Sequence, residues 1–126
     1  KDENNTNTLS IAGSAFSPDM KRWFEACNQR TGLTLRYRYD SGQENLLKRS
    51  DHWCFLKAGI PSVLLFTGFH PDYHRPSDTA DKINYEKLER ILRLLYLSVW
   101  ELADQTSPPR FMVPRSTTAK AGSQQP

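Results

Sequence analysis

Residues 62–66 read SVLLF, and this apolar run decides the fold class. A continuous apolar run of strand length is typical of a β-strand that is buried on both faces. Such strands occur in sheets that helices cover on each side. Pro61 precedes the run and excludes a helix continuing into it. The run therefore predicts a strand at the centre of an α/β fold.

The patterns on either side of this run predict alternating helices and strands. Strands are expected at residues 8–12 (TLSIA) and 33–39 (LTLRYRY), and helices after a cap at Ser17, after Ser50 or Asp51, and at 85–103 after a cap at Asn84. This order is that of an α/β domain with helices packed on a sheet. Three such strands alone would leave an exposed apolar edge, so we infer that the chain is the C-terminal part of a larger domain.

Apolar residues at helical spacing identify the faces that each predicted helix should bury. In the first helix they are Met20, Trp23, Phe24 and Cys27, in the second Phe55 and Leu56, and in the third Leu88, Ile91, Leu92, Leu95, Val99 and Leu102.

Composition excludes several classes of protein. The 126 residues carry 17 Lys and Arg against 14 Asp and Glu, and these are spread along the chain, which argues against a nucleic-acid-binding surface. No apolar stretch approaches the roughly 20 residues that a membrane span needs. The two cysteines, Cys27 and Cys54, match no metal-binding spacing and are predicted to be buried thiols rather than a disulfide. Residues 1–104 are assigned to the domain, and the polar residues 105–126 to a disordered tail.

Residues 70–79 read HPDYHRPSDT and directly follow the apolar strand. In open α/β sheets, ligands bind beyond the carboxyl ends of the strands. His74 is the candidate metal ligand, and Tyr73 could donate a hydrogen bond to a developing oxyanion. By residue type alone, a histidine in a polar loop is more often solvated than a metal ligand, and Asp72, Ser77 and Asp78 could simply cap the turn.

A second stretch, SDHWCF at residues 50–55, by itself indicates only the capped start of a helix. In combination, SDHxxF at 50–55, AGIP at 58–61 and DYHRPSDTxDKIN at 72–84 resemble the C-terminal half of the catalytic domain of zinc aminopeptidases of metallopeptidase family 28. The resemblance runs from about Thr6 to Leu102. It implies a three-layer α/β sandwich, with a mixed, mostly parallel sheet and helices on both faces.

The resemblance also implies a site with two zinc ions and a peptide substrate. Of the family's five metal ligands, the final histidine corresponds to His74, and the tyrosine before it, here Tyr73, stabilises the tetrahedral intermediate. Ser50, Asp51 and His52 are expected at the rim of the substrate pocket. Asp78 is a candidate for orienting the loop or the His74 ring, with a turn cap as the alternative.

The other four ligands and the general-base glutamate belong upstream of Lys1, so the upstream half of the same domain is the expected partner. This chain alone is then expected to be inactive. The resemblance further implies export to the periplasm or secretion. Two alternatives stay open for the whole protein, a glutaminyl-cyclase-like acyl transferase of the same fold and a non-catalytic homologue. For the 126 residues alone, an α/β fragment without activity is a third.

Overall fold

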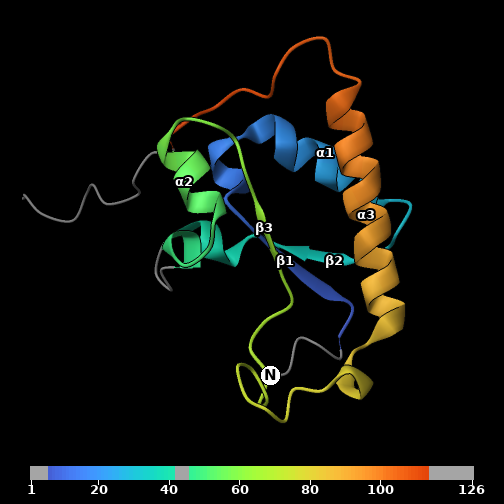
Figure 1. The fold of residues 1–126 in the computed structure, drawn as a ribbon. Helices are drawn as coiled ribbons and strands as arrows, with labels where there is room; N and C mark the ends of the chain where they lie inside the picture. Colours follow the sequence, from blue (N-terminus) through green and yellow to red (C-terminus); the bar gives the residue numbers. More distant parts are fainter. Residues whose placement is uncertain (1–5, 42–45, 114–126) are drawn as a thin grey trace, which may run out of the picture.

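A computed structural model describes residues 6–41 and 46–113 of the chain. The strands are β1 (Thr8–Ala12), β2 (Thr34–Arg36) and β3 (Leu64–Phe66), the α-helices are α1 (Pro18–Asn28), α2 (His52–Lys57) and α3 (Tyr85–Ala103), and the 3₁₀ turns are η1 (Ser14–Phe16), η2 (Arg38–Ser41), η3 (Leu46–Lys48) and η4 (Ala80–Lys82) (Figure 1). The predicted order of strands and helices is confirmed, although β2 and β3 are shorter than predicted.

The sheet has the strand order β2-β1-β3, with β1 in the middle. β1 runs parallel to β2, with Leu9 opposite Leu35, and antiparallel to β3, with Ile11 opposite Leu65. Each residue of β1 is buried, as expected for a central strand covered on both faces. The sheet is therefore mixed, as the predicted fold class requires.

Helical elements cover both faces of β1, which gives three layers. Successive side chains of a strand point to opposite faces. Leu9 and Ile11 face the first core cluster, which contains Met20 and Phe24 of α1 and Leu94 of α3. Ala12 belongs to a second cluster, whose other buried members are Tyr39, Leu46, Leu47 and Leu56. The α/β sandwich that the sequence predicts is present.

Two of the three predicted N-caps are confirmed, whereas Asp51, at the N-cap of α2, makes no side-chain capping bond among the described residues. The Ser17 hydroxyl accepts a hydrogen bond from the Met20 amide at 3.3 Å, and Pro18 occupies the first turn of α1. The Asn84 side chain accepts from the Lys87 amide at 3.1 Å at the start of α3. Such caps each contribute about 1 kcal/mol, because they pair amides that have no partner within the helix.

The predicted burial of β3 is wrong. Its residues are half-buried, because within the described residues β3 lies at the edge of the sheet and pairs only with β1. Val63 and Leu65 pack against the first core cluster, and Leu64 and Phe66 pack against the second. The strand therefore touches both layers without being enclosed by them.

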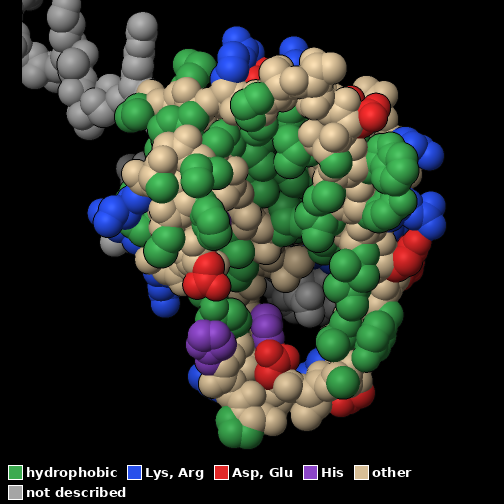
Figure 2. Space-filling model, turned by 45° about the horizontal axis from the view of Figure 1, so that its top comes forward, with side chains coloured by type: hydrophobic (Ala, Val, Ile, Leu, Met, Phe, Trp, Pro, Cys, Tyr) green, Lys and Arg blue, Asp and Glu red, His purple; other side chains and the backbone are tan. Residues whose placement is uncertain are grey.

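The predicted core stripe of α3 is also wrong in large part. Leu94, outside that stripe, is fully buried, whereas Leu88, Leu92, Leu95 and Val99 are exposed, Leu92 by 55%. Ile91 and Leu102 are half-buried. Figure 2 shows hydrophobic side chains lining a hollow between the sides of the molecule that carry α2 and α3, with histidine side chains near its lower end. A cavity of about 120 Å³ between α1, Val63 and the last turns of α3 belongs to this region, and it is lined by apolar side chains and Ser98.

Smaller corrections concern α2 and the cysteines. In α2, Leu56 is buried as predicted, but Phe55 is 53% exposed. Both cysteines are free, as predicted, but Cys27 is half-buried and Cys54 is exposed. Among the residues that the structure describes, no helix is long and apolar enough to cross a bilayer.

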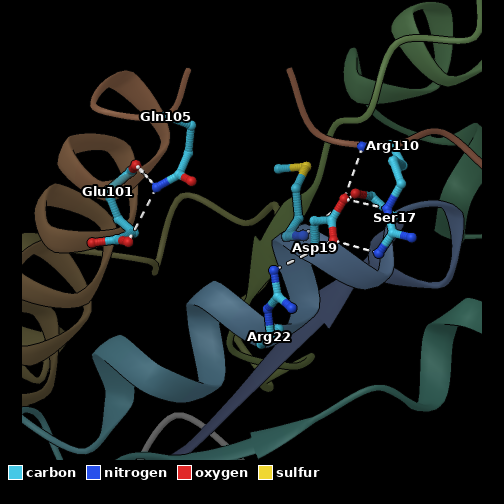
Figure 3. A network of polar contacts seen from close by, with 7 residues as sticks. Ser17, Asp19, Arg22, Glu101, Gln105 and Arg110 are labelled. Atoms are coloured by element: carbon cyan, nitrogen blue, oxygen red, sulfur yellow. Dashed lines mark hydrogen bonds and ion pairs between the residues drawn. The ribbon is translucent and has the colours of Figure 1, made fainter. Parts of the chain in front are cut away.

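Beyond α3 the chain returns across the start of α1 without regular structure. Arg110 binds Asp19 (Figure 3). Phe111 stacks on Phe16 with ring centroids 5.8 Å apart, and the Met112 amide donates to the Phe16 carbonyl at 2.8 Å. We call residues 107–113 the C-terminal strap. The predicted disordered tail stays a prediction for residues 114–126, which lie outside the described residues.

Candidate functional site

The loop that follows β3 carries the two residues with the clearest chemistry, Tyr73 and His74. Figure 1 shows it at the end of β3 opposite α2, at the foot of the molecule. It begins with Thr67 and leads through η4 into α3. It therefore leaves the carboxyl end of a strand, which is where open α/β sheets bind ligands.

A series of ring contacts connects Tyr73 to the core. The buried ring of Tyr39 meets Phe66 edge to face with centroids 5.7 Å apart, and Phe66 meets Phe69 at 5.1 Å. Phe69 in turn contacts Tyr73 at 5.1 Å, nearly perpendicular to it. Edge-to-face contacts of this kind are directional, so the series favours one orientation of the Tyr73 ring.

The side-chain rings of Tyr73 and His74 are in direct contact. Their rings stack with centroids 4.0 Å apart and an interplanar angle of 14°. His74 is exposed, and no described residue forms a hydrogen bond or an ion pair with its ring. The two side chains thus present a phenol and an imidazole on one surface.

His74 adopts a left-handed backbone conformation with φ 59°, the only described residue other than glycine to do so. A Cβ atom disfavours this region, and such residues cluster at functional sites, where surrounding contacts maintain them. The loop around His74 must therefore supply contacts that offset this strain.

Asp72 joins the two ends of this loop. Its Oδ1 accepts from the Ser77 hydroxyl at 2.7 Å, and its Oδ2 accepts from the Lys82 ammonium at 2.9 Å. Lys82 also donates to the Ser77 carbonyl at 2.7 Å. The bond from Ser77, followed by that from Lys82, lowers the pKa of the Asp72 carboxyl.

Asp78 lies beside His70 rather than His74. Its Oδ2 is 3.8 Å from His70 Nε2, and both residues line a cavity of about 560 Å³ between the loop and the start of α3. This placement does not support a role in orienting the His74 ring. A role in orienting the loop stays a prediction.

The three residues predicted at the pocket rim lie away from the Tyr73–His74 loop, and their role at a substrate pocket stays a prediction. Ser50 and Asp51 precede α2 and His52 begins it, and Figure 1 places α2 and the loop at opposite ends of β3. Asp51 is exposed and Ser50 half-buried, whereas His52 is buried, with its backbone carbonyl accepting from the Ser62 hydroxyl at 2.7 Å. The structure brings Tyr73 and His74 together but leaves these three residues apart from them.

The His52 imidazole is also unpaired. Neither of its ring nitrogens has a hydrogen-bond partner among the described residues. Burial lowers the pKa of the imidazole, and the negative charges of Asp40 and Asp51 act in the opposite direction. The ring therefore favours its neutral form.

The described residues supply a single candidate ligand and no complete metal centre. No group of three or more His, Cys, Asp or Glu side chains among them is arranged to hold a metal ion. Zinc sites in proteins use three or four protein ligands. His74, exposed and without a polar partner in the described part of the chain, fits one ligand of a site that other residues would complete.

Comparison with known proteins decides the family. The model of a family described as Peptidase family M28 matches residues 2–99. The chain belongs to peptidase family M28. No curated protein and no solved structure matches it.

As a member of family M28, the chain belongs to the metallopeptidases. Metallopeptidases of this family are hydrolases and are generally zinc-dependent. The match includes SDHWCF, β3, the Tyr73–His74 loop and most of α3. The C-terminal strap lies outside it. The family thus accounts for the part of the chain in which the motifs occur.

The sequence pattern does not predict the contact of Asp72 and Ser77 with Lys82. By residue type, Asp72 and Ser77 are candidates for turn caps, and Lys82 belongs to the stretch before α3. The signal in the sequence is the regular spacing of an acid, a hydroxyl and a base at residues 72, 77 and 82. Spacing alone does not show that a proline-containing loop folds back on itself.

Proposed function

We propose that the protein containing this chain is a zinc-dependent aminopeptidase, which hydrolyses the first peptide bond of a peptide by means of a metal-activated water. The observation that carries the proposal is the stacked Tyr73–His74 pair in a strained loop at the carboxyl end of β3, within the M28 match. In this proposal, His74 is the last metal ligand of the site and Tyr73 is a catalytic residue.

When bound, two zinc ions would lower the pKa of a water toward 7 and would polarise the scissile carbonyl. This chain contributes two side chains to the proposed site. His74 offers an exposed imidazole nitrogen, and the Tyr73 hydroxyl donates a hydrogen bond to the oxygen on which negative charge develops. The ring contacts with Phe69 and Phe66 support this by restricting the position of the Tyr73 ring.

The remaining ligands and the general base are assigned to an upstream half of the same domain. Two observations support a further segment that packs against α3 and β3. The exposed residues Leu88, Leu92, Leu95 and Val99 lie at helical spacing on α3, a pattern typical of a buried face. Residues 62–67 along the edge strand carry no charge, whereas natural edge strands usually carry charges that prevent pairing.

The experiment uses the full-length protein. Purified enzyme is incubated with short peptides, with a zinc chelator and after zinc is restored, and released amino acids are quantified. We expect release from the N-terminus that the chelator abolishes and zinc restores. Cyclisation of an N-terminal glutamine without release would favour the cyclase, and absence of both activities with no bound zinc would favour a non-catalytic homologue.

Metal content tests His74 separately. We expect the His74→Ala protein to lose much of one zinc equivalent, measured by elemental analysis after dialysis. His70→Ala is the matched control, since this histidine lies in the same loop beside Asp78. Equal zinc content in the wild-type and His74→Ala proteins would remove His74 from the site. Export stays a prediction, which cell fractionation can check.

A further inference from the structure

The contacts of Asp72 close the loop around the Tyr73–His74 pair. Asp72 directly precedes the pair, whereas Ser77 and Lys82 follow it. The bonds Ser77–Asp72, Lys82–Asp72 and Lys82–Ser77 form a closed set of three, at 2.7, 2.9 and 2.7 Å. Residues 73–76 are thereby confined to the tip of a loop whose ends are tied together.

The backbone inside this closure is also tightly turned. The Tyr73 amide donates to the His70 carbonyl at 3.1 Å, Arg75 to Asp72 at 2.9 Å, and Asp78 to Arg75 at 3.0 Å. Successive turns leave the chain few conformations, and His74 takes the left-handed one inside the second turn, between Asp72 and Arg75. An exposed ion pair alone contributes little, but here one cation binds two different positions of the same loop.

We propose that Asp72, Ser77 and Lys82 act together as a loop lock that keeps His74 in its left-handed conformation, stacked on Tyr73, so that its imidazole is already aimed at the metal before zinc binds. The lock residues are positioning residues, since none of them touches the metal or the substrate in this proposal. The inference rests on the proposed role of His74 as a zinc ligand.

The physical reason is preorganisation. A ligand held in its binding conformation does not lose conformational entropy when the metal binds, and groups that only orient a ligand commonly contribute about 10–100-fold in metal affinity. Without the lock, a residue with a Cβ atom leaves the left-handed region, and the ring contact with Tyr73 is lost with it. Affinity should fall although the ligand itself is unchanged.

The test removes the cation from the lock in the full-length protein. Lys82→Met keeps the length of the side chain, Lys82→Arg keeps its charge, and Arg75→Met is the matched control, which removes a positive charge from the same exposed loop. Two quantities are measured for each variant: the zinc dissociation constant, by competition with a chelator, and hydrogen exchange at the Tyr73, Arg75 and Asp78 amides of the metal-free protein.

We expect Lys82→Met to raise the zinc dissociation constant about tenfold or more and to speed exchange at these amides. Lys82→Arg should restore both values toward the wild type, and Arg75→Met should leave both unchanged. Wild-type affinity in Lys82→Met, with or without faster exchange, would overturn the proposal. So would an equal loss of affinity in Arg75→Met, which would indicate a general charge effect.

The proposed function and the lock can fail independently. If His74→Ala and the wild type bind zinc equally, the role of His74 in the proposed function fails, and the lock loses its purpose. If His74→Ala loses zinc while Lys82→Met does not, the lock alone is wrong. Ser77→Ala is a second test of the lock. This variant removes the hydroxyl hydrogen bond to Asp72 and keeps the charges of the loop, so it should show part of the loss of zinc affinity expected for Lys82→Met.

Discussion

Asp19 and Arg110, 91 residues apart in the chain, form a two-pronged ion pair at the start of α1 (Figure 3). Arg110 Nε lies 2.9 Å from Asp19 Oδ2 and its Nη2 lies 2.7 Å from Oδ1, while the Arg110 backbone amide donates to Oδ2 at 3.0 Å. Bidentate, charge-assisted pairs of this kind are stronger than hydrogen bonds between neutral groups. The pair attaches the C-terminal strap to α1.

We expect Arg110→Met to release the strap from the body of the protein. The variant loses the paired N–H groups, although the backbone amide of residue 110 can still donate. Hydrogen exchange at the Met112 amide, which donates to the Phe16 carbonyl, should become faster. Arg22→Met is the matched control, because Arg22 lies 3.6 Å from Asp19 and its side chain is 71% exposed. Equal exchange in the two variants would show that the strap does not depend on the bidentate pair.

Strap attachment should also depend on pH. Hydrogen bonds from Arg110 lower the pKa of the Asp19 carboxyl, and Arg22 adds a smaller effect. Because the folded pKa lies below the ordinary value of about 3.9, the stabilisation is complete above that pH and is lost as pH falls toward the folded pKa. In the wild type, hydrogen exchange at the Met112 amide, corrected for its intrinsic pH dependence, should therefore become faster below about pH 4. It should not change in this way in Asp19→Asn, and the same change in that variant would contradict the assignment.

Gly13→Ala should destabilise the protein strongly. Gly13 has φ +99°, and a Cβ added there would lie 2.5 Å from the Ser62 carbonyl oxygen. Left-handed strain and this backbone clash together predict a loss of roughly 2–4 kcal/mol in the free energy of unfolding. Gly59→Ala is the control, since Gly59 has φ +78° but no described atom within 4 Å of the added Cβ. It should cost only about 1–2 kcal/mol, and chemical denaturation compares the two.

Two leucines on α3 test whether the upstream half covers its exposed face. Leu94 is fully buried, and Leu94→Ala should cost about 2–5 kcal/mol. Leu92 is 55% exposed in this chain, so Leu92→Ala should cost no more than about 0.5 kcal/mol unless another segment covers it. In the full-length protein we expect a cost above about 1 kcal/mol, measured by denaturant unfolding. A negligible cost there would contradict the predicted upstream neighbour on this face.

Tyr73→Phe tests the oxyanion role in the full-length enzyme. Losing a single oxyanion donor costs about 10²–10³ in turnover, so kcat should fall by that factor while zinc content stays unchanged. Tyr85→Phe is the matched control, because the Tyr85 hydroxyl donates to the Ala80 carbonyl at 3.0 Å instead. Turnover of Tyr73→Phe within a few-fold of the wild type would remove Tyr73 from the mechanism.

The sequence predicts those parts of the fold that depend on nearby residues. Ser17 and Asn84 indicate the starts of α1 and α3, because a cap bonds to an amide only three residues away. The position of Tyr73 and His74 after an apolar strand likewise follows from local order. Local rules do not show which side of a helix will be covered, and therefore they predict burial for the stripe containing Leu92 and not for Leu94.

The sequence by itself determined the order of the elements, the caps of α1 and α3, and the motifs that identify the M28 family. Only the tertiary structure decided that β3 lies at the edge of the sheet, that Asp72 closes the loop through Ser77 and Lys82, and that Asp19 binds Arg110. The physical reason is the separation along the chain over which each interaction acts. Helix periodicity and capping act within a few residues, whereas burial and ion pairing depend on which distant segments the folded chain brings side by side.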